Sequence, residues 1–156
     1  MRLNSAKDLE VYKKAYALSM EIFLVSKVFP TEERFALTGQ IRRSSRSVCL
    51  NLREVWAKRR YEAHFVSKLT DCDGENSETD SSLDFARDCG YITVEQHANL
   101  TALCREVGKM LGSMMNKPES FLIRRPNVEG QPEVGVSENG GRNNRSRRSE
   151  VGSRRD

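Results

Sequence analysis

Four arginines in the middle of the chain form its clearest chemical pattern. Arg42, Arg46 and Arg53 follow one another at spacings of four and seven residues, and Arg43 stands beside the first. On a helix, these spacings bring side chains to one face. We therefore expect Arg42, Arg43, Arg46 and Arg53 to contribute to a basic surface that contacts phosphates. A solvated helix surface without a ligand is the alternative interpretation.

The segment that carries these arginines offers no interleaved aromatic residue for base stacking. We therefore expect binding without sequence readout, with an affinity that falls steeply as salt rises.

The acidic stretch that begins at Asp71 is a weak candidate for a metal site. It starts like a calcium-binding loop, but an EF-hand requires glycine at its sixth position and glutamate at its twelfth. Counted from Asp71, those positions hold Asn76 and Ser82. The carboxylates also spread around a helix, whereas a two-metal nuclease requires convergent ones. We expect no metal site, and an acidic surface that is solvated or paired with arginines of a neighbouring subunit.

The remaining reactive side chains do not form a catalytic motif. His64 and His97 stand in separate segments, and no Ser/His/Asp or phosphate-loop signature is present. We expect neither enzymatic activity nor a cofactor. The cysteines stand far apart, without a C-x-x-C pair, and we expect each to be a buried or half-buried small hydrophobe in a reducing compartment. They are Cys49, Cys72, Cys89 and Cys104.

Length and composition fit one small domain followed by a tail. The chain has 156 residues, of which 37% are apolar and 31% charged, and its net charge of +4 permits a nucleic-acid partner without requiring one. The apolar run from Ala15 to Phe29 is interrupted by Glu21 and Lys27, so it predicts neither a secretory signal nor a membrane span. We expect a cytoplasmic location.

Apolar periodicity predicts four helices. The first begins near Ser5, whose hydroxyl forms a capping box with Asp8. The second runs from about Thr31, as its N-cap, to about Lys58, and a turn follows near Lys58 to Tyr61. The expected buried positions are Val11, Ala15, Leu18, Ile22, Val25 and Phe29 in the first helix, and Leu37, Ile41, Ser44, Val48, Leu52 and Val55 in the second. Tyr12, Tyr16 and Phe23 widen the first apolar face, as a bundle core or an oligomer contact would.

The third and fourth helices continue the pattern. Gly90 ends the third and Thr93 to Gln96 caps the fourth, while Gly74 weakens the third helix locally. Gly108 and Gly112 would let a neighbouring helix approach closely. The expected buried positions are Phe65, Leu69, Cys72, Asn76, Thr79, Leu83 and Ala86, then Leu100, Leu103, Val107, Met110 and Met114. The short links predict an all-α, up-down-up-down antiparallel four-helix bundle.

The character of the chain changes after Pro118. Glycine, proline and arginine punctuate a stretch with no hydrophobic period, which cannot bury enough apolar surface to become ordered. We expect a four-helix bundle over residues 1–120 and a disordered basic tail over 121–156. The arginines of the tail, a rival source of nucleic-acid binding, are Arg142, Arg145, Arg147 and Arg148.

Several motifs together resemble the bacterial four-helix bundle proteins also known as ribosomal RNA intervening-sequence proteins. The matching residues are Asp8-Leu9-Glu10-Val11-Tyr12, Phe29-Pro30 with Glu32-Glu33-Arg34-Phe35 and Leu37, Gln40-Ile41-Arg42-Arg43-Ser44, Ser47-Val48, Asn51-Leu52 with Glu54, Phe65 with Leu69, Gly74, Ala86, Gly90-Tyr91-Ile92, and Glu106-Val107-Gly108-Lys109-Met110-Leu111. The resemblance covers about Leu3 to Phe121. The chain departs from the family at Arg53-Glu54-Val55, where Ala-Glu-Gly is usual, and at Thr79, where leucine is favoured.

The resemblance implies an all-α protomer that assembles as a homopentamer with a basic surface, and no catalytic residues. Its related branch is the accessory variability determinant of diversity-generating retroelements, which associates with a reverse transcriptase and nucleic acid. Two functions remain open. The first is an oligomeric nucleic-acid-binding protein, with RNA favoured over DNA, that has no membrane partner. The second is a protein-interaction scaffold, for example an adaptor for a reverse transcriptase.

Overall fold

A computed structural model describes residues 2–124. Of the tail expected over residues 121–156, the part from residue 125 onward lies outside the described residues. The described residues contain four α-helices and no strand, and the helices are α1 (Glu10–Ser26), α2 (Leu37–Ala57), α3 (Glu62–Asp88) and α4 (Val94–Asn116). Three short 3-10 helices accompany them, η1 (Ala6–Asp8), η2 (Thr31–Glu33) and η3 (Pro118–Ser120).

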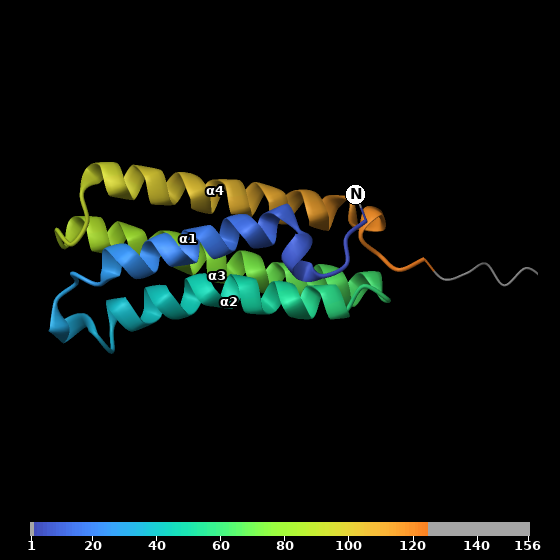
Figure 1. Ribbon diagram of the computed structural model, residues 1–156, viewed down its shortest axis with the longest axis horizontal. Helices are drawn as coiled ribbons and strands as arrows, with labels where there is room; N and C mark the ends of the chain where they lie inside the picture. Colours follow the sequence, from blue (N-terminus) through green and yellow to red (C-terminus); the bar gives the residue numbers. More distant parts are fainter. Residues whose placement is uncertain (1, 125–156) are drawn as a thin grey trace, which may run out of the picture. The chain divides into compact units, whose positions relative to one another are not determined.

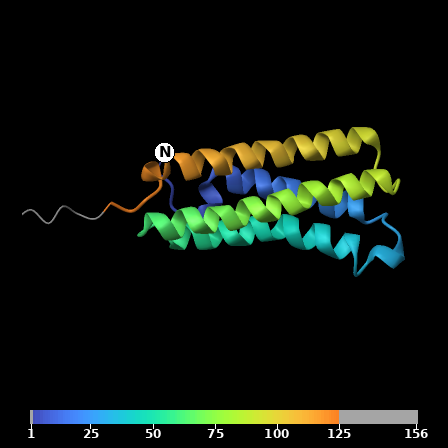
Figure 2. The same cartoon turned by 180° about the vertical axis from the view of Figure 1, so that it is seen from behind.

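The helices form the predicted up-down-up-down bundle. Consecutive helices pack against each other, and α1 also packs against α4, which closes the bundle (Figures 1 and 2). The beginning of the chain lies at the same end of the bundle as the C-terminus of α4 (Figure 1). No helix in the described part of the chain is long and apolar enough to cross a membrane.

The start of the first helix differs in detail from the prediction. The Ser5 capping box is present, because the Asp8 carboxylate accepts hydrogen bonds from the backbone N–H groups of Asn4 (2.8 Å) and Ser5 (2.9 Å). It caps η1, however, and α1 begins only at Glu10. The chain therefore turns once before α1 starts.

The predicted start of the second helix at Thr31 is wrong. Thr31 begins the 3-10 helix η2, in which no side chain supplies a cap, and α2 begins at Leu37. The backbone leaves helical geometry at Ala36 (φ −115°, ψ −109°), so a helix cannot run through this position. Glu33 provides the cap instead, because its Oε2 accepts a hydrogen bond from the Leu37 N–H at 3.0 Å.

The turns at both ends of α3 lie where the sequence places them. The α2–α3 turn has no glycine, and the carbonyl of Arg59 there accepts a hydrogen bond from the N–H of Ile123 (3.0 Å), which ties the turn to the end of the described chain. After α3, Gly90 adopts φ 76°, and Thr93 forms the predicted capping box with Gln96. At this position the positive φ favours glycine.

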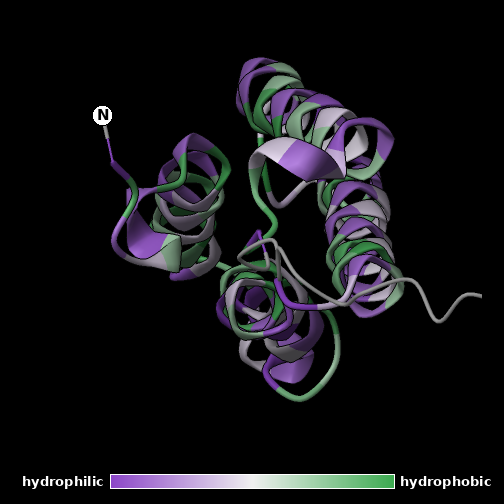
Figure 3. Ribbon diagram, turned by 90° about the vertical axis from the view of Figure 1, so that its right-hand side faces the viewer, coloured by the Kyte–Doolittle hydropathy of each residue, from purple (hydrophilic) through white to green (hydrophobic). Residues whose placement is uncertain are grey.

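The core consists of two apolar clusters, one toward each end of the bundle. All seven predicted positions of α3 are buried, which confirms its period. In α4 the buried seam instead includes Cys104 and Leu111, while Leu103 and Met110 are only partly buried. Figure 3 looks along the bundle and shows that each helix carries both apolar (green) and polar (purple) residues.

A polar layer separates the two clusters, and it consists of Ser19, Ser44, Ser45, Asn76 and Thr79. The Ser19 and Ser45 hydroxyls lie 3.3 Å apart between α1 and α2, and those of Ser44 and Thr79 lie 2.8 Å apart between α2 and α3. The Asn76 amide donates to the Cys104 carbonyl of α4 at 2.9 Å. The Asn76 Oδ1 atom is buried without a hydrogen-bond partner in the described structure. The predicted polar positions Asn76 and Thr79 therefore join helices.

Glycines have less effect on packing than predicted. The helix α3 continues through Gly74 without a break. A Cβ atom at Gly108 would lie 3.5 Å from the Asn76 amide nitrogen, an ordinary contact, whereas one at Gly112 would meet nothing within 4 Å. Of the two glycines of α4, Gly108 is therefore the one that faces a neighbouring helix closely.

Candidate nucleic-acid interface

Three of the four predicted arginines share one surface with three aromatic residues of the preceding helix. We call this surface the α1–α2 face; it consists of Tyr12, Tyr16 and Phe23 from α1 and Arg42, Arg46 and Arg53 from α2. The helices are antiparallel, and the contact of Ser19 with Ser45 fixes which residues lie opposite each other. Phe23 therefore lies near Arg42, and Tyr12 lies near Arg53.

The Phe23 ring is bordered by three cations. The guanidinium carbons of Arg42 and Arg46 lie 4.9 and 5.9 Å from the ring centroid, and the Lys27 ammonium lies at 4.9 Å. Arg42 also donates from Nε to the Ser26 hydroxyl at 2.8 Å. Cation–π contacts at exposed sites contribute about 0.5–1 kcal/mol each. Phe23 thus holds both arginines against the bundle surface.

The expectation that no aromatic ring interleaves with the arginines is therefore wrong. The spacing of the arginines within their own helix could not reveal Phe23, because this residue comes from the neighbouring helix. The breadth of the apolar face of α1, which includes Phe23, was the available signal.

The other end of the α1–α2 face contains two tyrosines. Their rings stack with centroids 6.3 Å apart and an interplanar angle of 18°. Burial raises the pKa of Tyr12, and the nearby Arg53 charge acts in the opposite direction. Tyr16 is 54% exposed, so its ring is open to a ligand.

Arg43 points to a different side of the bundle. Its guanidinium donates to Glu75 at 3.2 Å and to Glu78 at 2.7 Å, both on α3. The hydrogen bond to Glu75 is the main reason that the pKa of Arg43 is raised. The structure therefore brings Arg42, Arg46 and Arg53 together but separates Arg43 from them.

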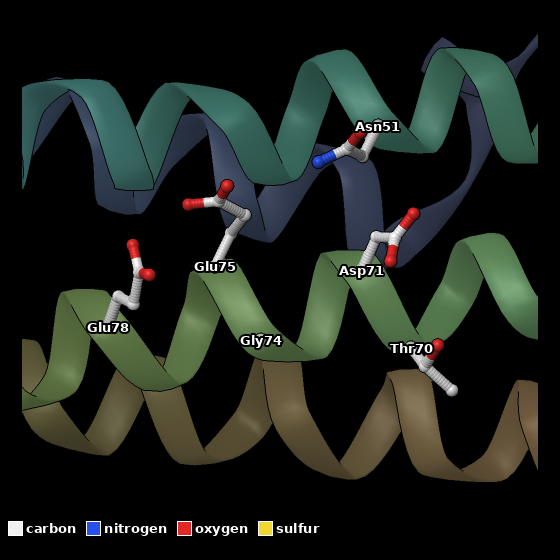
Figure 4. A pocket seen from close by; sticks show the side chains of 6 residues that line it. All are labelled: Asn51, Thr70, Asp71, Gly74, Glu75 and Glu78. Carbon is white, nitrogen blue, oxygen red and sulfur yellow. The ribbon is translucent and has the colours of Figure 1, made fainter.

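The α2–α3 side is acidic. A cavity of about 380 Å³ there is lined by Asn51, Thr70, Asp71, Gly74, Glu75 and Glu78 (Figure 4). Asp71 lies inside the continuous helix α3, so it does not open a calcium loop. Within residues 2–124, no group of three His, Cys, Asp or Glu side chains could hold a metal ion.

The histidines and cysteines do not share a site. His97 lies 2.7 Å from Asp84, while His64 packs against Tyr61. Burial raises the pKa of Cys49 to about 11 and those of Cys72 and Cys104 to about 12, as expected for small core residues. Cys89 is exposed, which corrects its predicted burial. It is the C-cap residue of α3, next to Gly90.

A groove that the sequence does not indicate lies between the start of the chain and the end of α4. It has a volume of about 720 Å³ and combines apolar side chains, such as Val11, Met110 and Phe121, with basic and acidic residues. The basic residues are Arg2, Lys13, Lys109 and Lys117, and the acidic ones are Asp8 and Glu10, of which Glu10 pairs with Lys13 at 3.2 Å. Both ends of the described chain contribute to it, so no local pattern could reveal it.

The chain is similar to known proteins in sequence and in fold. The sequence model of the 23S rRNA-intervening sequence protein family matches residues 7–113. A crystal structure from Bacteroides thetaiotaomicron, of a protein with unknown function from the S23 ribosomal protein family, is 29% identical. The similarity has a TM-score of 0.63 and covers 69% of this chain and 96% of that one. No curated protein matches the chain.

Proposed function

The chain belongs to the 23S rRNA-intervening sequence protein family, and on this premise we propose that it is a non-enzymatic, oligomeric protein that binds RNA through the α1–α2 face. RNA is favoured over DNA because the family is named for a ribosomal RNA. We also propose a cytoplasmic location.

The observation that carries the proposal is that the arginines of the α1–α2 face are held in place but are not paired with carboxylates. Phe23 positions Arg42 and Arg46, and Arg53 lies on the same face. Within residues 2–124, none of these three forms an ion pair with a carboxylate, in contrast to Arg43. Their charge therefore remains available for phosphates, which bind basic side chains with release of counterions.

A single protomer offers few phosphate contacts, so we propose that the oligomer supplies the rest. The resemblance of the sequence implies five subunits in a closed ring. Repetition of the α1–α2 face around such a ring would raise the overall affinity through effective concentration, without a new kind of contact. Native mass spectrometry measures the subunit number directly.

The experiment compares two substitutions that remove the same charge from the same helix. Arg46→Gln removes a cation from the α1–α2 face, and Arg43→Gln removes one that Glu75 and Glu78 already neutralise. RNA affinity is measured by fluorescence anisotropy across a salt series. For each RNA phosphate that the variant no longer neutralises, the log–log slope should fall by about 0.7 for single-stranded RNA. We expect this decrease for Arg46→Gln and an unchanged slope for Arg43→Gln.

Equal slopes for the wild type and both variants, with binding retained, would contradict the proposed site. That result would assign binding to the arginines beyond residue 124. Circular dichroism of each variant serves as the control for folding.

A second candidate function is supported by the groove between the start of the chain and α4. Its four basic residues outnumber its two acidic ones, so together with its apolar residues they complement an acidic, amphipathic segment of a partner protein, such as a reverse transcriptase. Under this proposal, Met110→Glu abolishes copurification with a coexpressed reverse transcriptase of a diversity-generating retroelement and leaves RNA affinity unchanged. Retained copurification would contradict the adaptor role of the groove.

A further inference from the structure

We infer that the α1–α2 face selects single-stranded over double-stranded RNA, with a base stacked on Tyr16 and the adjoining phosphates bound by Arg46 and Arg53. This inference rests on the proposed function and adds the strandedness of the ligand and the residue that recognises it.

Tyr16 presents an aromatic surface that is already oriented. It is 54% exposed, and it stacks against the half-buried ring of Tyr12 at an interplanar angle of 18°. Tyr12 thereby restrains the side chain of Tyr16 before any ligand binds. A ring restrained in this way loses little conformational entropy when a base stacks on it.

The α1–α2 face sets a row of aromatic rings on α1 beside guanidinium groups on α2. Arg42 and Arg46 border Phe23 at one end, and Arg53 lies near Tyr12 at the other. Tyr16 lies between the other two rings on α1. From Tyr12 to Phe23 the row extends over eleven residues, or about 16 Å at the helical rise of 1.5 Å per residue.

This combination of rings and cations suits a flexible strand better than a duplex. Phosphates require cations, and exposed bases require flat apolar surfaces, so a single strand can use both groups at once. In a duplex the base faces are stacked on one another, and proteins reach mainly the phosphates and 2′-hydroxyls. A duplex would therefore contact the arginines but could not use the Tyr16 ring.

The experiment measures the affinity of full-length protein for a single-stranded RNA and for the duplex formed from it. Tyr16→Ala removes the ring, and Tyr16→Phe retains it without the hydroxyl. Phe85→Ala removes an aromatic side chain of similar exposure, 65%, from the acidic helix α3. Fluorescence anisotropy at fixed salt gives the dissociation constants, and native mass spectrometry confirms an unchanged subunit number.

We expect the wild type to bind the single strand more tightly than the duplex. Removal of one base–aromatic stack should weaken single-strand binding of Tyr16→Ala by roughly 5- to 10-fold, at the lower end for such stacking. Duplex binding should not change in that variant. Tyr16→Phe and Phe85→Ala should match the wild type on both ligands.

Any one of four outcomes would overturn the inference. If the wild type binds the single strand and the duplex with equal affinity, or if Tyr16→Ala weakens binding of both equally, the α1–α2 face contacts only phosphates. The proposed RNA binding would still hold. If Tyr16→Ala changes the subunit number while Tyr16→Phe does not, Tyr16 belongs to a contact between copies of the chain. Absence of RNA binding by the wild type would contradict the proposed function as well.

Discussion

Replacement of Asn76 by leucine should make the protein more stable. Asn76 lies in the polar layer, 5% exposed, and its Oδ1 atom is buried without a partner. The amide nitrogen forms one hydrogen bond, at 2.9 Å to the Cys104 carbonyl. Leucine would remove both the satisfied and the unsatisfied atom, and on α4 it would face Gly108, which has no side chain.

The expected change in the free energy of unfolding follows from the two polar atoms of the Asn76 side chain. Loss of the hydrogen bond costs about 1 kcal/mol, whereas an unsatisfied buried acceptor destabilises the fold by about 1–3 kcal/mol. Burial of the leucine methyl groups adds stability. Part of this gain is lost because neighbouring side chains must rearrange around the new shape. We expect the free energy of unfolding to rise by about 1–2 kcal/mol.

Thr79→Val is the matched control in the same layer. The Thr79 hydroxyl has two partners, the Ser44 hydroxyl at 2.8 Å and the Glu75 carbonyl at 2.9 Å, so its removal should lower stability by about 0.5–1.5 kcal/mol. Urea unfolding followed by circular dichroism, at fixed protein concentration, gives both values from the shift in midpoint. A decrease of about 1 kcal/mol or more for Asn76→Leu would refute the reasoning, because it would mean that Oδ1 has a hydrogen-bond partner.

Two further predictions concern groups outside the core. A thiol reagent should modify the exposed Cys89 rapidly and the other three cysteines only after unfolding, because burial protects them and raises their pKa; mass spectrometry of the native protein counts the modified sites. The backbone N–H groups of Asn4 and Ser5 lower the pKa of Asp8 below 3.8, so its stabilising contribution is complete above that value and is lost as pH falls through the lower folded pKa. Asp8→Asn should therefore show a weaker loss of stability on acidification in thermal melts, and an unchanged acid response would contradict this assignment.

The sequence predicts those features that depend on one helix at a time. The period from Phe65 to Ala86 identifies every buried position of α3, because each side chain on that seam meets the core whatever its neighbours are. The capping boxes at Ser5 and Thr93 are likewise local, and both are present. The start of α2 could not be inferred in this way, since Glu33 caps from a separate 3-10 helix and Thr31 has the residue type of a cap without that role.

The candidate site required tertiary information. Arg42 and Arg43 are adjacent in sequence, yet one packs on Phe23 of α1 and the other pairs with Glu75 and Glu78 of α3. A helical repeat places residues on faces, but it does not say which neighbour covers each face. The sequence shows the aromatic residues of α1 only as an unusually broad apolar face, so their place beside the arginines could not be predicted.

The location of both ends of the described chain at one end of the bundle has a mechanical consequence. A force applied between residues 2 and 124 would load α1 and α4 from the same end, so their contacts would break in succession and not all together. The hydrogen bond between Ile123 and Arg59 would be among the first under tension. We expect a chain pulled at these two residues to unfold one helix after another at low force. Chemical denaturation, by contrast, should unfold the whole bundle cooperatively.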